Sequence, residues 1–374
     1  MITMQVITHD VSLADSSMRC QLTSFHFGTP GSGKKVYIQA ALHADEVPGM
    51  LVAQFLRTEL AALEDRLHGE VILVPAANPI GLAQAIQGAP FGRFDLTTGI
   101  NFNRAYKHVA DELKQSLKGK LGLDAAANVA LVRDHARASV AAWQPGTDAE
   151  ALKKILLSLA IDADIVLDLH CDNEAVLHIY AGTPLAERVK PLAALMGAHA
   201  VLLALAGGGE PFDEACSRLW WDLAAHFGPD QPIPENACLS TTVELRGEMD
   251  VNYACAERDA RALLQFLARE GMFELPLAPL PAALCEPTPL EGVQPIAAPH
   301  AGVLVFVREL GEQVKVGDTI ADLINPVSGA STPLRAEVDG VLFARTAHRH
   351  LLRGMAVAKI AGATAYRAGN LLSQ

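Results

Sequence analysis

The first two-thirds of the chain alternates short apolar, β-branched runs with longer segments in which apolar residues recur every three or four positions. The short runs predict strands and the longer amphipathic segments predict helices. The expected strands are 35–42, 70–76, 164–169, 200–204 and 241–245, and the expected helices are 50–67, 128–143, 149–160, 185–196 and 255–271. Strands separated by helices are typical of an α/β fold with a mostly parallel sheet flanked by helices.

The composition changes near residue 273. Seven of the 21 prolines lie in the 27 residues 273–299, and this density excludes a regular helix or a central strand. We therefore expect an α/β domain at 1–272, a proline-rich linker at 273–298 and a small domain at 299–374.

The small domain contains a near-repeat of short apolar strands and glycine turns. Gly302 and Gly317 bracket the first half, and Gly340 and Gly354 bracket the second. Two matched halves predict a small all-β sandwich, which resembles the barrel-sandwich of biotinyl/lipoyl carriers. The segment 325–335, between the halves, has no lysine that could carry a cofactor. A structural or gating domain is therefore expected rather than a carrier.

The net charge, the apolar content and the cysteines limit the classes of binding partner and the cellular location that we expect. The net charge of −12 argues against nucleic acid as a main partner, although a local arginine cluster could still bind an anionic substrate. Residues 1–10 do not have the pattern of a signal peptide, and no run of about 18 apolar residues predicts a membrane span. Six scattered cysteines are typical of reduced thiols, so we expect a cytoplasmic protein. The oligomeric state stays open, with a homo-oligomer possible.

Two segments supply candidate metal ligands. His43 and Glu46 lie on the loop between an expected strand and an expected helix, where both side chains can face one point. His170 ends another expected strand, and period-2 geometry puts Asp168 on the same side of that strand. Zinc commonly takes two histidines and one carboxylate, and a second carboxylate often orients a ligand histidine. The alternatives are a chance His-x-x-Glu pair, a strand-end histidine with ordinary partners, and Asp168 as a helix cap.

Two further segments carry polar groups suited to substrate chemistry. Asn103 and Arg104 adjoin in a loop and could grip a carboxylate, and Arg93 lies just upstream. Glu244 lies within an apolar, β-branched run, where a carboxylate is costly unless it is paired or functional. Taken alone, each of these arginines is more often a solvated surface charge.

Together these pieces resemble the zinc carboxypeptidase superfamily and, within it, the succinylglutamate desuccinylase/aspartoacylase family. The resemblance covers about residues 35–270, and members often carry a small C-terminal β domain. The matching pieces, in chain order, are His43-x-x-Glu46, Asn103-Arg104, His170 and Glu244. The departures are Asn101, where relatives usually have Asp, Ala44-Asp45 in place of Gly-Asn or Gly-Asp, and an assisting tyrosine with no assigned position.

The resemblance implies roles for these residues. It implies one Zn²⁺ per chain on His43, Glu46 and His170, and it implies Glu244 as the general base. Arg93 would polarise the scissile carbonyl, and Asn103 with Arg104 would hold a substrate carboxylate, in the hydrolysis of a small N-acyl amino acid. A metallocarboxypeptidase acting on peptides and a non-catalytic binding protein are the competing hypotheses.

Overall fold

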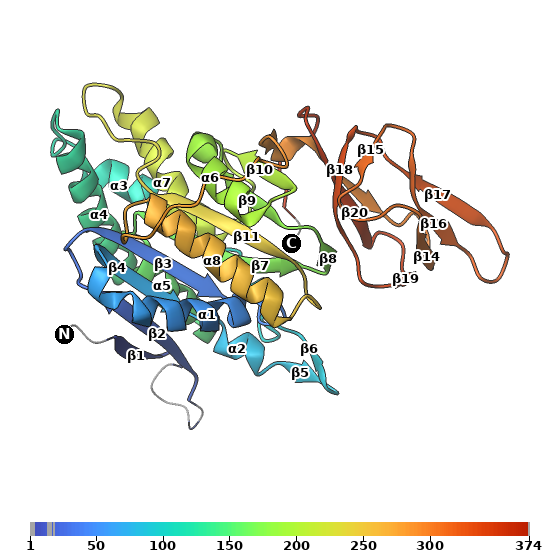
Figure 1. The fold of residues 1–374 in the computed structure, drawn as a ribbon, viewed down its shortest axis with the longest axis horizontal. Helices are drawn as coiled ribbons and strands as arrows, with labels where there is room; N and C mark the ends of the chain where they lie inside the picture. Colours follow the sequence, from blue (N-terminus) through green and yellow to red (C-terminus); the bar gives the residue numbers. More distant parts are fainter. Residues whose placement is uncertain (1–3, 13–16, 18, 373–374) are drawn as a thin grey trace.

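A nine-stranded mixed sheet forms the centre of the molecule in the computed structural model, which describes residues 4–12, 17 and 19–372 (Figure 1). Five of its eight neighbouring pairs are parallel, which confirms a mostly parallel central sheet. The strands, in spatial order, are β1 (Gln5–Asp10), β2 (Gln21–Gly28), β4 (Gly69–Val74), β3 (Lys34–Ala40), β7 (Ile165–Asp172), β11 (Leu239–Gly247), β9 (His178–Gly182), β10 (Ala200–Ala204) and β12 (Thr288–Pro289).

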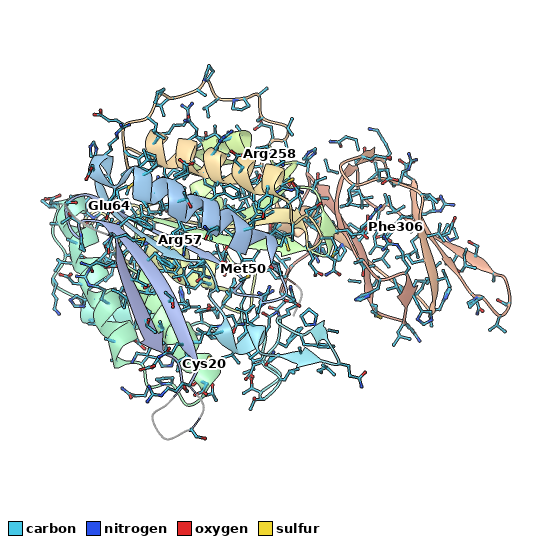
Figure 2. The ribbon with its side chains drawn as sticks, turned by 60° about the horizontal axis from the view of Figure 1, so that its bottom comes forward. Cys20, Met50, Arg57, Glu64, Arg258 and Phe306 are labelled. Carbon is cyan, nitrogen blue, oxygen red and sulfur yellow. The ribbon has the colours of Figure 1, made fainter. Side chains whose placement is uncertain are left out.

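Helices cover both faces of this sheet, as the α/β pattern predicts. One face is covered by α1 (Pro48–Ala62), α6 (Ala186–Met196) and α8 (Tyr253–Arg269), and Figure 2 shows Arg57 and Arg258 on two of these helices. The other face is covered by α3 (Ala110–Ser116), α4 (Ala125–Ala142), α5 (Asp148–Ala160) and α7 (Phe212–Phe227). Each face has its own apolar core. Short helical turns occur at α2 (Pro79–Leu82), η1 (Glu64–Arg66), η2 (Thr183–Leu185) and η3 (Leu290–Gly292).

All ten expected elements are present, nine of them with shifted ends, and β10 has the expected ends. The helix expected to reach residue 67 ends at Ala62, and the 3-10 turn η1 follows it. The strand expected to reach residue 42 ends at Ala40, because Ala41 adopts a left-handed φ of 59°. The elements β1, β2, β9, α3 and α7 were not among those expected.

The strand register aligns polar side chains on the sheet face beneath α7. Gln39 on β3 pairs with Asp168 on β7, and Asp168 pairs with Thr242 on β11. Further along β7, His170 pairs with Glu244 on β11. Cross-strand partners project from the same face, so neighbouring strands bring these polar groups together at their C-terminal ends.

Two antiparallel sheets follow the proline-rich segment and enclose a separate apolar core. The segment 273–298 adds β12 to the edge of the large sheet, where proline is tolerated, and then starts β13. One sheet contains β13 (Val293–Ala297), β20 (Ala356–Gly362), β18 (Gly340–Arg345) and β15 (Gln313–Val314), and the other contains β17 (Ser331–Arg335), β16 (Thr319–Ile324), β14 (Gly302–Phe306) and β19 (His350–Leu351).

The C-terminal sheets pack against the part of the large unit that carries His170. The short strand β8 (Glu174–Ala175) follows β7 and pairs with β18. Glu174 accepts hydrogen bonds from Arg345 at 2.7 Å and from Arg349 at 2.7 and 3.0 Å. The guanidinium groups of these arginines also lie over the ring of Phe306, which is labelled in Figure 2. These contacts fix the smaller unit at the C-terminal end of β7.

Residues 371 and 372 return to the large unit, where they pack with side chains of β10. The amide of Leu371 donates to the carbonyl of Gly207 at 2.9 Å. Residues 1–3, which entered the expectation about a leader segment, lie outside the described ranges. Among the described residues, no helix has the length and apolar content to cross a membrane.

Candidate metal centre and active-site cavity

Three buried side chains converge where β3 and β7 end. His43 Nδ1 lies 2.7 Å from one carboxylate oxygen of Glu46, and His170 Nδ1 lies 2.7 Å from the other. One ligand atom from each residue lies within 4.8 Å of the other two, so the cluster could hold a metal ion. Two imidazole nitrogens and a carboxylate oxygen are a donor set that suits zinc.

The remaining ring nitrogens of both histidines face polar partners. His43 Nε2 donates to Asn101 Oδ1 at 2.8 Å, and the same oxygen accepts the amide of Asn103. His170 Nε2 lies 3.0 Å from a carboxylate oxygen of Asp168, as expected from strand geometry, and Gln39 holds the other oxygen of that carboxylate. With Asn101 at Nε2 of His43 and Asp168 near Nε2 of His170, the Nδ1 atoms of both rings face the shared carboxylate of Glu46. The residue set therefore fits a metal ion.

The loop that carries His43 and Glu46 is fixed by local backbone features. Ala41 turns the chain through its left-handed conformation, and Pro48 starts α1 at a position where its missing N–H is harmless. Gly92 packs against this loop, with its carbonyl accepting the amide of Ala44 at 3.1 Å. A Cβ at Gly92 would lie only 2.4 Å from the amide nitrogen of Asp45, so the close approach needs glycine.

The next residue, Arg93, follows the small β5 (Ala85–Ile86) and β6 (Ala89–Pro90) hairpin and reaches the cluster. Its Nη1 lies 3.2 Å from Glu46 Oε1 and 3.3 Å from His43 Nδ1. About a third of the Arg93 side chain is exposed, so its guanidinium borders the open space above the cluster.

Asn103 and Arg104 line the same cavity, but both also have structural contacts. Asn103 Oδ1 accepts the amide of Phe212 at 2.9 Å, which ties this loop to the start of α7. Arg104 Nη1 donates to the carbonyl of Asn103 at 2.6 Å. Burial lowers the pKa of Arg104, and the nearby carboxylates of Asp213 and Glu214 counter this effect.

Glu244 faces the cluster from the neighbouring strand. Its Oε2 is buried and has no hydrogen-bond partner among the described residues. Burial, followed by the negative charge of Glu46, raises the pKa of Glu244 to about 8. A carboxyl with such a pKa can hold or release a proton near neutral pH. Tyr180 on β9 lines the same cavity.

The electrostatics of the cluster favour a cation. Burial alone would raise the pKa of Glu46, but the two imidazoles hold it well below its usual range. Burial opposes protonation of His170, yet Asp168 and Glu46 raise the pKa of His170 well above its usual value. Burial lowers the pKa of His43. Glu46 is thus a buried anion, which a metal ion could neutralise.

The cavity above the cluster has a volume of about 350 Å³ and is lined by all seven predicted site residues. The cavity is also lined by residues that the sequence analysis did not identify. Asp213 and Glu214 come from the start of α7, and burial raises the pKa of Asp213 to about 6 and that of Glu214 to about 7. Lys359 comes from β20 of the C-terminal sheets, and its Nζ lies 2.5 Å from Asp172.

The fold and the cluster define an α/β protein with a candidate His–Glu–His metal site and a C-terminal β unit at its cavity. Residues 32–133 match the succinylglutamate desuccinylase/aspartoacylase catalytic domain. That segment contains five of the seven predicted site residues, up to Arg104. The expected resemblance to the succinylglutamate desuccinylase/aspartoacylase family is therefore confirmed.

Solved structures share the fold over nearly the whole chain. A protein provisionally described as a member of this family, from Shewanella amazonensis SB2B, is 27% identical, with a TM-score of 0.81 over 96% of this chain and 98% of its own. A similar protein from Shewanella frigidimarina NCIMB 400 is 24% identical, with a TM-score of 0.83 over 97% and 98%. The product-bound ectoine utilization protein EutE (DoeB) from Ruegeria pomeroyi is 17% identical, with a TM-score of 0.67 over 97% and 96%. No curated protein gives a significant match.

We predict that the purified protein binds one zinc ion per chain and that His43→Ala removes it. Asn101→Ala should weaken zinc affinity roughly 10- to 100-fold, because it removes the partner that orients His43. Elemental analysis and competition with a chromophoric chelator measure both effects. His348→Ala, at an exposed histidine of the C-terminal sheets, is the matched control and should keep its zinc. Unchanged zinc content in His43→Ala would disprove the site.

Proposed function

We propose that the protein is a zinc-dependent hydrolase of the amide bond in a small N-acyl amino acid. The observation that carries this proposal is the convergence of His43, Glu46 and His170 with Glu244 in one cavity. Glu244 pairs in register with His170, so its carboxyl lies beside the proposed metal position. The family resemblance supports amide hydrolysis as the reaction.

Each residue has a role that follows from its position. Zinc held by the cluster would supply Lewis-acid chemistry and make a water molecule acidic near neutral pH. Glu244 accepts the proton of the attacking water and passes it to the leaving nitrogen. Arg93, at the open side of the cluster, stabilises the negative charge that develops on the carbonyl oxygen.

The substrate carboxylate is assigned to Arg104, with Asn103 holding the loop. Arg104 lines the cavity together with the proposed metal ligands and donates to the carbonyl of Asn103, so its guanidinium is held beside the site. Asn103 in turn accepts the amide of Phe212, which fixes the loop that carries both residues.

The C-terminal unit favours a small substrate over a peptide. Ala356 and Lys359 of β20 line the cavity, so residues 299–374 form one of its walls. A peptidase needs a cleft open at both sides of the scissile bond, and this wall restricts that opening. We therefore interpret residues 1–272 as the catalytic domain and the C-terminal unit, similar to a biotinyl/lipoyl barrel-sandwich, as a gating wall.

Replacing Glu244 by Gln should reduce turnover by several orders of magnitude while the protein keeps its fold and its zinc. An amide cannot accept the proton that the mechanism assigns to this carboxylate. A hydrolysis screen of N-acyl amino acids with zinc-loaded protein supplies the substrate, and elemental analysis monitors the metal. Glu235→Gln, at an exposed position, is the control. If turnover by Glu244→Gln stayed within about tenfold of wild type, Glu244 would have a structural and not a catalytic role.

Removal of the substrate carboxylate should reduce kcat/KM by about ten- to a hundredfold. Hydrogen bonds to charged groups contribute about 1.5–3 kcal/mol each, and conversion to a neutral amide forfeits that contribution at Arg104. Arg104→Ala should cause a similar loss with the acid and abolish its preference over the amide. Arg258→Ala, on the outer side of α8, should change neither value. Equal losses for acid and amide in Arg104→Ala would instead indicate that Arg104 only braces its loop.

A further inference from the structure

A second cavity, of about 310 Å³, lies between the large unit and the C-terminal sheets. It adjoins the cavity of the metal cluster, because Asp172, Tyr180 and Lys359 line both. Its volume falls at the lower end of the range of small-molecule sites. The second cavity therefore lies next to the cavity in which we propose that the reaction occurs.

More than half of the residues that line the second cavity are apolar, and several of these are buried. Leu290 is 4% exposed, Val293 3%, Ile296 7% and Val357 1%, and Leu371 of the returning chain end is 9% exposed. An apolar surface of this kind binds apolar groups, since contact with them removes surface from water.

The positions of Arg104 and Lys359 determine how a bound substrate would be oriented. Arg104 lines the central cavity and a third cavity next to Phe94 and Ile100, but it does not line the second one. Lys359 lines the central and second cavities, but it does not line the third. A substrate whose carboxylate is held by Arg104 can therefore extend its other end, the acyl group, towards the second cavity.

The cations at the second cavity already have partners. Lys359 is neutralised by Asp172 at 2.5 Å, and Arg345 is held by Glu174 at 2.7 Å. Arg367 Nη2 donates to the carbonyls of Leu290 and Leu371, although its Nε has no hydrogen-bond partner among the described residues. A terminal carboxylate would have to compete with these contacts, whereas an apolar chain would not.

We propose that the second cavity is the subsite for the acyl group and that it selects an extended apolar acyl chain over acetyl or succinyl. This inference rests on the proposed amide hydrolysis and adds the substrate class. The C-terminal unit then determines specificity, because its strands β13, β18 and β20 build most of the apolar wall.

The test compares N-acetyl, N-butanoyl, N-succinyl and N-hexanoyl derivatives of one amino acid, with kcat/KM as the readout. Each methylene that becomes buried should improve the value by about fourfold, from ~0.8 kcal/mol per methylene, so hexanoyl should exceed acetyl on the order of 100-fold. Binding of free acetate, butyrate, succinate and hexanoate, measured by calorimetry on the zinc-loaded protein, gives a second readout that needs no turnover.

Ala344→Leu fills the second cavity from β18, where Ala344 is 1% exposed, and should reduce the hexanoyl-to-acetyl ratio to within about threefold of one. Leu371→Phe provides a second filling variant if the first fails to fold. Ala301→Leu adds the same volume at an exposed position and should keep the wild-type ratio.

The outcomes separate the two proposals. If no N-acyl amino acid is hydrolysed but hexanoate binds more tightly than acetate, and Ala344→Leu removes that difference, the subsite stands and the amide-hydrolase proposal fails. A flat chain-length profile in both readouts would overturn the subsite. So would a preference for succinyl over butanoyl together with succinate over butyrate, because it would show recognition of a carboxylate at Lys359 or Arg367.

Discussion

The site depends on one buried carboxylate that holds two imidazoles from different parts of the chain. Glu46 contacts His43 on its own loop and His170 at the end of β7, 124 positions away in sequence. Its Oε2 also accepts the backbone amide of Cys171 at 3.1 Å, so the carboxylate ties the start of α1 to the strand that carries His170. Removing one partner from such a buried group typically costs about 3–5 kcal/mol, because the remaining charge is left uncompensated. A cation at the Nδ1 atoms would relieve the same imbalance, and this is why the cluster suits a metal ion.

The sheet topology is the reason these groups meet. Because β3, β7 and β11 are adjacent and parallel, their C-terminal ends place His43, His170 and Glu244 at one edge of the sheet. The C-terminal sheets pack at that same edge, through the pairing of β8 with β18 and through Lys359 on Asp172, two residues after His170. The smaller unit is thus joined directly to the strand that carries His170. This position supports the gating or specificity role that we propose for it.

The sequence predicted the parts of the site that depend on local pattern. Strand-end positions and period-2 alternation marked His43, His170 and Asp168 as candidates, and an apolar setting marked Glu244. The family resemblance then favoured these residues over the structural alternatives. Local sequence patterns could not predict contacts between strands, helices or loops that are distant in sequence and adjacent only in the folded protein. Asn101 was noted only as a departure from relatives, and its contact with His43 depends on the path of a long loop. Tyr180 and Lys359 reach the cavity because β9 joins β11 and β20 faces β7. For α7 the signal was present, since Phe212, Cys216, Leu219 and Leu223 have helical spacing.

We propose that His43, Glu46 and His170 bind zinc through the atoms that converge in this structure. The most direct test is X-ray diffraction from crystals of the zinc-loaded protein, with anomalous data collected on both sides of the zinc absorption edge. We predict one strong zinc peak per chain, about 2.0–2.2 Å from His43 Nδ1, His170 Nδ1 and a Glu46 oxygen. An empty cluster, or a zinc peak bound only by other residues, would contradict it.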